Sequence, residues 1–222
     1  MKKTPILFAL ALGVAAAPAF AGIDLTFEDA DTNLLNAPDF SGTTTGIANA
    51  SATRTTAEFN DILDTSFTQG IQSHEASFEW TTDDPASALI RGTDFSDRHA
   101  LSETDGGVGL YIKYDGSAGD MEINIGIREE PVNSDDNEVY ENTVWKTLSG
   151  SADWQYFWWD LSTETDASAD SWAISIALGD GTYDGAGGSD APEYEGYFLR
   201  PIQGTTAINT TITLYIDDIH SG

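Results

Sequence analysis

Apolar and polar residues alternate along several short stretches of the chain. Alternation with a period of two places apolar side chains on one face of a β-strand and polar side chains on the other. Turn residues such as Asp115-Gly116 separate the stretches, and helical periodicity is nearly absent. The pattern predicts an all-β protein, a single antiparallel β-sandwich. The clearest predicted strands cover residues 23–27, 76–80, 109–114, 121–128, 171–178 and 211–218.

Other parts of the chain lack this alternation. Residues 61–69 have the spacing of one short helix or turn. Residues 29–60 and 180–207 are expected to be rich in loops, because Gly, Asp, Asn and Ser interrupt them.

The predicted strand at residues 154–161 is unusually aromatic, with five aromatic side chains between Trp154 and Trp159. One face of this strand is apolar enough for a hydrophobic core. The other offers flat rings beside a carboxylate, which suits stacking on a sugar or burial beneath a loop. Alternation assigns Phe157, Trp159 and Leu161 to the first face, and Tyr156, Trp158 and Asp160 to the second.

Residues 1–21 have the three parts of a secretory signal peptide. Lys2 and Lys3 supply the positive charge, residues 6–17 form a short apolar run, and Ala19-Phe20-Ala21 has the form of a cleavage site. The apolar run is too short to span a membrane comfortably. We therefore expect cleavage near Ala21-Gly22 and one exported domain at residues 22–222, in the periplasm or outside the cell.

The chain is strongly acidic, with 37 Asp and Glu against nine Lys and Arg, a net charge of −28. Such a charge repels nucleic acid and anionic membranes, and it disfavours polyanionic substrates unless a cation bridges them. The carboxylates either maintain solubility in a saline medium or bind divalent cations. No cysteine is present, so disulfides do not stabilise the fold.

Several motifs follow one another in a characteristic order. They lie at residues 27–29, 109–116, 123–129, 154–161 and 214–219. In their order and spacing the chain resembles the β-jelly-roll carbohydrate-binding modules appended to cellulases and other β-glucanases, relatives of the galactose-binding-like fold. The resemblance covers nearly all of residues 22–222. It implies a jelly-roll sandwich that binds polysaccharide and has no catalytic activity.

The resemblance also implies a structural calcium ion that joins the first strand to the last. Glu28 and Asp217 match the side-chain ligands, and backbone carbonyls would complete the shell. Calcium takes six to eight oxygen ligands of this kind. The alternative is two solvated carboxylates at strand ends.

In such modules the open face of one sheet binds the glycan. Its rings would stack on sugars, and its polar side chains would bond to hydroxyls. The small residues Ala173, Ser175 and Ala177 would leave room for the sugar chain, unless loops 129–138 or 180–207 cover the rings. Trp80, Trp145 and Trp172 are expected in the core. The candidate ligand-binding residues are Tyr111, Lys113, Asn124, Arg128, Tyr156, Trp158 and Asp160.

Little in the sequence indicates catalysis. His74, His99 and His220 are scattered without metal-binding spacing. A glycosidase needs two carboxylates in one cleft, and Glu122 and Asp160 are the pair that would share a groove if both strands face it.

Three hypotheses follow. The first is an exported, non-catalytic module that binds a neutral, β-glucan-like polysaccharide and is stabilised by calcium. The second is an extracellular structural or adhesive subunit that self-associates into a filament or surface layer. The third is a jelly-roll glycoside hydrolase or lyase.

Overall fold

The computed structural model describes residues 24–25, 35–41, 44–55, 73–91, 99–101, 106–129, 139–164, 177–178 and 193–222. The predicted signal peptide, the short helix or turn at 61–69 and most of the predicted strand at 171–178 lie outside these residues. Within the described residues there is no helix, so none that could cross a membrane.

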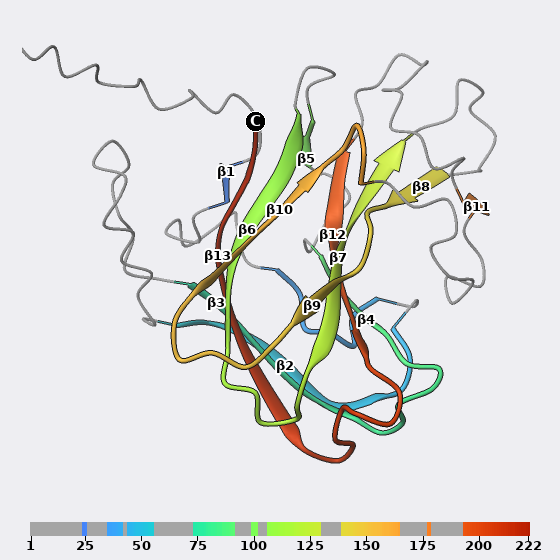
Figure 1. Cartoon of the computed structure of the whole chain (residues 1–222), viewed down its shortest axis with the longest axis vertical. Helices are drawn as coiled ribbons and strands as arrows, with labels where there is room; N and C mark the ends of the chain where they lie inside the picture. Colours follow the sequence, from blue (N-terminus) through green and yellow to red (C-terminus); the bar gives the residue numbers. More distant parts are fainter. Residues whose placement is uncertain are drawn as a thin grey trace, which may run out of the picture.

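The described strands form two sheets that pack as one β-sandwich of the jelly-roll type (Figure 1). This confirms the predicted all-β fold class. Among the described strands every pairing is antiparallel except that of β8 (Val139–Asn142) with β11 (Ala177–Leu178). The first sheet has the order β10 (Gln155–Asp160), β6 (Gly107–Tyr114), β13 (Thr211–Ser221), β3 (Ser73–Trp80) and β2 (Ile47–Thr55), and β1 (Asp24–Leu25) pairs with β13. The second has the order β11 (Ala177–Leu178), β8 (Val139–Asn142), β7 (Met121–Glu129), β12 (Glu193–Pro201) and β4 (Ala88–Arg91), with β5 (His99–Ala100) beside β12 and β9 (Lys146–Leu148) beside β7.

The hydrophobic core lies between the two sheets and follows the predicted alternation. Along β6 the core side chains are Val108, Leu110, Ile112 and Tyr114, and along β7 they are Met121, Ile123, Ile125 and Ile127, all fully buried. Removing this apolar surface from water is the main force that holds the sheets together. In β10, Trp159 is fully buried and Tyr156 is 47% exposed, so the predicted facing of these two rings is confirmed.

The three tryptophans expected in the core differ in their burial or lie outside the description. Trp80 is fully buried, as predicted. Trp145 is only half-buried, and the Arg200 guanidinium lies 4.2 Å from the centre of its ring, so the core prediction for Trp145 is wrong. Trp172 lies outside the described residues.

The two segments predicted to be loop-rich each contain a nine-residue strand, so that prediction is wrong in part. In β12, Tyr197, Phe198 and Leu199 are all at least 96% buried. Both faces of this central strand are covered, so it has no apolar–polar alternation to detect. β2, an outer strand of the described sheet, consists of Ile, Ala, Asn, Ser, Thr and Arg, and its pattern is weak.

Candidate functional site

The seven candidate ligand-binding residues divide between the two sheets. Tyr111 and Lys113 lie in β6, and Tyr156, Trp158 and Asp160 lie in the neighbouring strand β10. Asn124 and Arg128 lie in β7, which belongs to the second sheet. The prediction of one face for all seven is therefore wrong. Alternation gives the face of a strand but not its sheet, and the chain crosses between sheets at residues 115–120.

Asn124 does not stand on an open surface. Its side chain is fully buried, and Nδ2 donates to the Thr143 carbonyl at 3.2 Å. The residue opposite it in β12 is Phe198, which is also buried. The Arg128 side chain lies outside the description. None of the small residues expected to leave room for the sugar chain is described on the first sheet. Ala177 lies in β11 of the second sheet, and Ala173 and Ser175 are not described.

The five remaining candidates share the outer face of the first sheet, where they meet a ring that the sequence did not suggest. We call Tyr111, Tyr156, Trp158 and His220 the aromatic cluster. The ring centroids of Tyr111 and Tyr156 are 4.8 Å apart, and those of Tyr156 and His220 are 5.7 Å apart. Trp158 lies 6.0 Å from His220. Tyr156 is the most exposed of the four, and Tyr111 and Trp158 are half-buried.

Two glycines in β6 make room for the rings. Gly109 pairs with Trp158, and Gly107 pairs with Asp160. A Cβ on Gly109 would lie 2.6 Å from the Tyr156 hydroxyl, 2.9 Å from Trp158 Cε3 and 3.0 Å from His220 Nε2. A Cβ on Gly107 would also collide with the Trp158 indole. Glycine within a strand commonly marks such a close approach, so the ring positions depend on both glycines.

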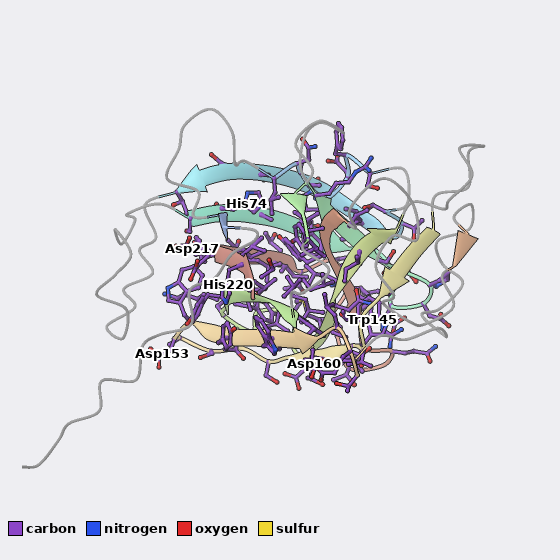
Figure 2. All side chains as sticks on the ribbon, turned by 90° about the horizontal axis from the view of Figure 1, so that it is seen from above. His74, Trp145, Asp153, Asp160, Asp217 and His220 are labelled. Atoms are coloured by element: carbon purple, nitrogen blue, oxygen red, sulfur yellow. The ribbon has the colours of Figure 1, made fainter. Side chains whose placement is uncertain are left out.

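His220 reaches this face through a β-bulge. The register of β13 against β6 shifts between Asp217 and His220, and Asp218 has a φ of 48°. The bulge adds residues to one strand, so a simple period of two assigns the wrong face beyond it. Sequence reasoning ended the strand at Asp218 and treated His220 as a scattered histidine. In Figure 2, Asp217 and His220 lie close together and apart from Trp145.

Hydrogen bonds link the cluster to the bulge. Tyr156 Oη lies 3.1 Å from His220 Nε2, and His220 Nδ1 lies 2.9 Å from the Asp218 carbonyl oxygen. The Asp218 carboxylate is 3.8 Å from the same nitrogen. Partial burial, then the nearby Tyr111 and Asp218, raise the pKa of the Tyr156 hydroxyl to about 12. Tyr156 therefore remains a neutral phenol that can form hydrogen bonds at physiological pH.

Polar side chains border the aromatic cluster. Lys113 is half-buried and pairs across the sheet with Tyr215 of β13. Burial, then the charges of Glu75 and Asp115, raise the pKa of Tyr215. At the other end Asp160 Oδ1 accepts hydrogen bonds from the Ser162 hydroxyl at 2.6 Å and the Ser162 amide at 2.9 Å. These bonds lower the pKa of the Asp160 carboxyl.

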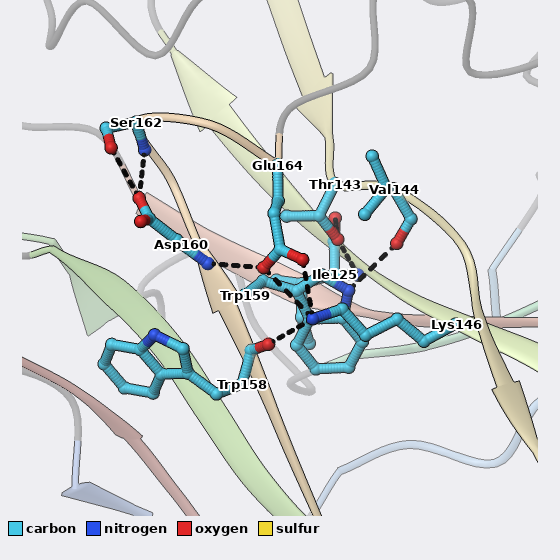
Figure 3. Close-up of polar contacts among 9 residues, drawn as sticks. All are labelled: Ile125, Thr143, Val144, Lys146, Trp158, Trp159, Asp160, Ser162 and Glu164. Atoms are coloured by element: carbon cyan, nitrogen blue, oxygen red, sulfur yellow. Dashed lines mark hydrogen bonds and ion pairs between the residues drawn. The ribbon is translucent and has the colours of Figure 1, made fainter.

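A charged pair contacts β10: Lys146 comes from β9 of the second sheet, and Glu164 lies just after the turn that follows β10 (Figure 3). Lys146 Nζ donates to the Trp158 carbonyl at 2.5 Å and lies 2.9 Å from Glu164 Oε1. Glu164 Oε2 accepts the Asp160 amide proton at 2.9 Å. We call Lys146 and Glu164 the edge clamp, because they bind the outer edge of β10.

The carboxylates considered for catalysis do not share a groove. Glu122 lies in β7 of the second sheet, where its Oε2 pairs with Arg200 Nε at 2.6 Å. Asp160 lies in β10 of the first sheet and is bound to Ser162. The hypothesis of a glycosidase pair at these two positions is therefore wrong.

The calcium prediction can be followed only at Asp217. This residue is buried, and one of its carboxylate oxygens accepts the Asp218 amide proton at 2.9 Å. β1 pairs with β13 next to the bulge, with Asp24 opposite His220, so the first and last strands are neighbours. Glu28 lies outside the described residues. Among those that are described, no three His, Asp or Glu side chains are grouped as metal ligands, so the Glu28–Asp217 site stays a prediction.

In fold the protein is similar to carbohydrate-binding modules. No protein-family model and no curated protein matches the chain. Among solved structures, the family 11 module from Clostridium thermocellum in complex with a β-1,3-1,4-mixed-linked tetrasaccharide matches with 14% identity and a TM-score of 0.42, covering 84% of this chain and 94% of that chain. The CBM22-1 xylan-binding domain from Paenibacillus barcinonensis Xyn10C matches with 13% identity and a TM-score of 0.43, covering 93% of this chain and 100% of that chain. Another family 22 xylan-binding domain matches with 13% identity and a TM-score of 0.36, covering 87% of this chain and 96% of that chain.

Proposed function

We propose that this protein is an exported, non-catalytic module that binds a neutral polysaccharide on the outer face of its first sheet. The observation that carries the proposal is the exposed ring of Tyr156, which lies within one contiguous group of rings with Tyr111, Trp158 and His220. A calcium ion between Glu28 and Asp217 would stabilise the domain by joining its first strand to its last.

The chemistry of this face suits a sugar chain. Aromatic rings provide flat apolar area, and the apolar face of a sugar ring packs against such area. Lys113 and Asp160 border the cluster with a donor and acceptors for hydroxyl groups. One apolar surface bordered by a few polar groups is the usual composition of a small-molecule site.

The charge around the cluster favours a neutral ligand. Glu75 and Asp115 are close enough to Tyr215 to raise its pKa, and Asp218 has the same effect on Tyr156. An anionic polysaccharide would be repelled by these carboxylates and by the net charge of −28. Hydroxyl groups of a neutral glycan carry no such penalty.

Affinity electrophoresis tests the proposal. The protein is run with calcium through gels containing laminarin, mixed-linkage β-glucan, xylan or mannan, and Tyr156→Ala and Phe40→Ala are run beside it. Phe40 is the matched control, because its ring is 54% exposed but lies near Arg91, outside the cluster. We expect at least one glycan to retard the unaltered protein and Phe40→Ala, and Tyr156→Ala to migrate freely. Free migration of the unaltered protein in every gel contradicts the proposal.

A further inference from the structure

Two rings of the aromatic cluster, Tyr156 and Trp158, lie in β10, the outermost strand of the first described sheet. β10 pairs with β6 along one side, and no strand of the described part lies along its other side. An outer strand is held by half the backbone hydrogen bonds of a central strand, and its free groups remain exposed to other partners. A ligand-binding strand in this place needs additional contacts to stay fixed.

The edge clamp supplies these contacts, with Lys146 reaching β10 from the second sheet and Glu164 from the segment just after β10. Lys146 lies in β9 opposite the buried Ile123, so its side chain starts on the inner side of the second sheet. It crosses to the first sheet, where its ammonium lies 5.4 Å from the Trp159 ring centre and donates to the Trp158 carbonyl. Glu164 holds the ammonium and the Asp160 amide at once.

The backbone also ties the clamp together. The Val144 amide donates to the Glu164 carbonyl at 2.7 Å, and Trp159 Nε1 donates to the Val144 carbonyl at 2.9 Å. Lys146 and Glu164 are 27% and 31% exposed, so water screens their pair only in part. Charge-assisted hydrogen bonds of this kind are stronger than neutral ones.

We propose that Lys146 and Glu164 are positioning residues for the glycan site: they fix the backbone of Trp158 and Asp160 and thereby the orientation of the rings. This inference rests on the proposed function. Without the ammonium, the Trp158 carbonyl loses its hydrogen bond from Lys146, and the Glu164 carboxylate keeps the Asp160 amide but loses its cation. The peptide groups of β10 then turn toward water, and the rings lose their fixed orientation. A fixed orientation lowers the entropic cost of binding.

A double-mutant cycle with mixed-linkage β-glucan, or whichever panel glycan retards the protein, tests this inference. Lys146→Met is expected to weaken binding about threefold to tenfold, the range for one partly screened, charge-assisted contact. In a Trp158→Ala background the same change is expected to have a smaller effect, because part of its effect passes through the orientation of the Trp158 ring. Lys146→Arg keeps a cation that reaches both acceptors and is expected to restore most of the affinity.

Arg200→Met is the matched control. It removes one positive charge from an ion pair with 26% and 27% exposure, but that pair lies in the second sheet. We expect its affinity to equal that of the unaltered protein. Thermal midpoints are measured for all variants, and Glu164→Gln replaces Lys146→Met if the latter does not fold.

Each outcome decides a separate point. Additive losses in the cycle, or an equal loss in Arg200→Met, overturn the positioning role while leaving the glycan site in place. Unaltered affinity in both Lys146→Met and Glu164→Gln also overturns the positioning role and leaves the glycan site in place. If the unaltered protein binds no glycan, the proposed function fails, and the positioning role fails with it.

Discussion

The Tyr156 hydroxyl lies 3.1 Å from Nε2 of His220, and the two rings are parallel to within 4°. The bond joins the edges of the two rings across the intervening strand β6, since Tyr156 lies in β10 and His220 in β13. It therefore links the outermost strand of the described sheet to its centre on the exposed face. Both the stability of this face and its ligand binding should depend on the bond.

Tyr156→Phe removes the bond and keeps the ring. We expect the free energy of unfolding to fall by about 0.5–1.5 kcal/mol, the usual net value of one hydrogen bond. Glycan retardation should weaken but persist, because the stacking surface remains. Urea unfolding and affinity electrophoresis check the two effects. Complete loss of retardation would mean that the hydroxyl, rather than the ring, is the main ligand contact.

The raised pKa of Tyr156 gives an alkaline dependence of stability. The pKa is near 10 in the unfolded chain and about 12 in the fold, so the protonated form is favoured by folding. The contribution is complete below pH 10 and is lost as the pH rises through 12. Urea unfolding at pH 9 and pH 11.5 should show a smaller decline for Tyr156→Phe than for the unaltered protein. Equal declines would contradict this assignment.

Gly109→Ala should displace the rings of the aromatic cluster. The new Cβ would lie within 3.0 Å of Tyr156, Trp158 and His220. Overpacking of this kind usually costs about 1–3 kcal/mol, and we expect glycan retardation to be lost as well. Gly106→Ala is the control: that residue is exposed, and its nearest neighbour would be the Gly222 carbonyl at 3.3 Å. Thermal melting and affinity electrophoresis of both variants check the comparison.

Local alternation predicted the facing of individual side chains well. Trp159 and Leu161 are buried in the core, and Tyr156 is exposed, because the period of two acts within one strand. The same reasoning failed for Asn124. Alternation correctly placed Asn124 on the other face of its strand from Ile123 and Ile125. Which of the two sheets contains β7, however, depends on where the chain crosses the sandwich, and no local pattern encodes this.

Two further elements show where sequence patterns lose information. β12 was expected to be part of a loop-rich segment. Both faces of this strand are covered by tertiary contacts, so its sequence lacks the apolar–polar alternation that identifies a strand. His220 was missed because the bulge after Asp217 changes the register, and a bulge depends on backbone conformation rather than on polarity. The edge clamp was also missed, since Lys146 of the second sheet meets Trp158 and Glu164 only through the packing of the sandwich.

The structural subunit hypothesis makes a different prediction from the binding module. A chain with a net charge of −28 repels its own copies at low salt, and assembly would require that charge to be screened by salt or bridged by calcium. If the glycan-binding proposal holds, the protein should sediment as a monomer with or without calcium, at low and at high salt. A large, calcium-dependent increase in sedimentation rate would instead favour assembly into a filament or surface layer.

Calcium removal tests the expected metal site. Binding of an ion only to the folded chain stabilises it by about 2.7 kcal/mol when calcium is at one hundred times its dissociation constant. We expect EDTA to lower the thermal midpoint of the unaltered protein and calcium to restore it, with no such difference in Asp217→Asn. Asp153→Asn is the control, because that carboxylate is exposed and should leave the calcium response intact. If EDTA leaves the midpoint of the unaltered protein unchanged, Asp217 is a buried carboxylate that acts through hydrogen bonds such as the one from the Asp218 amide, and the site has no metal.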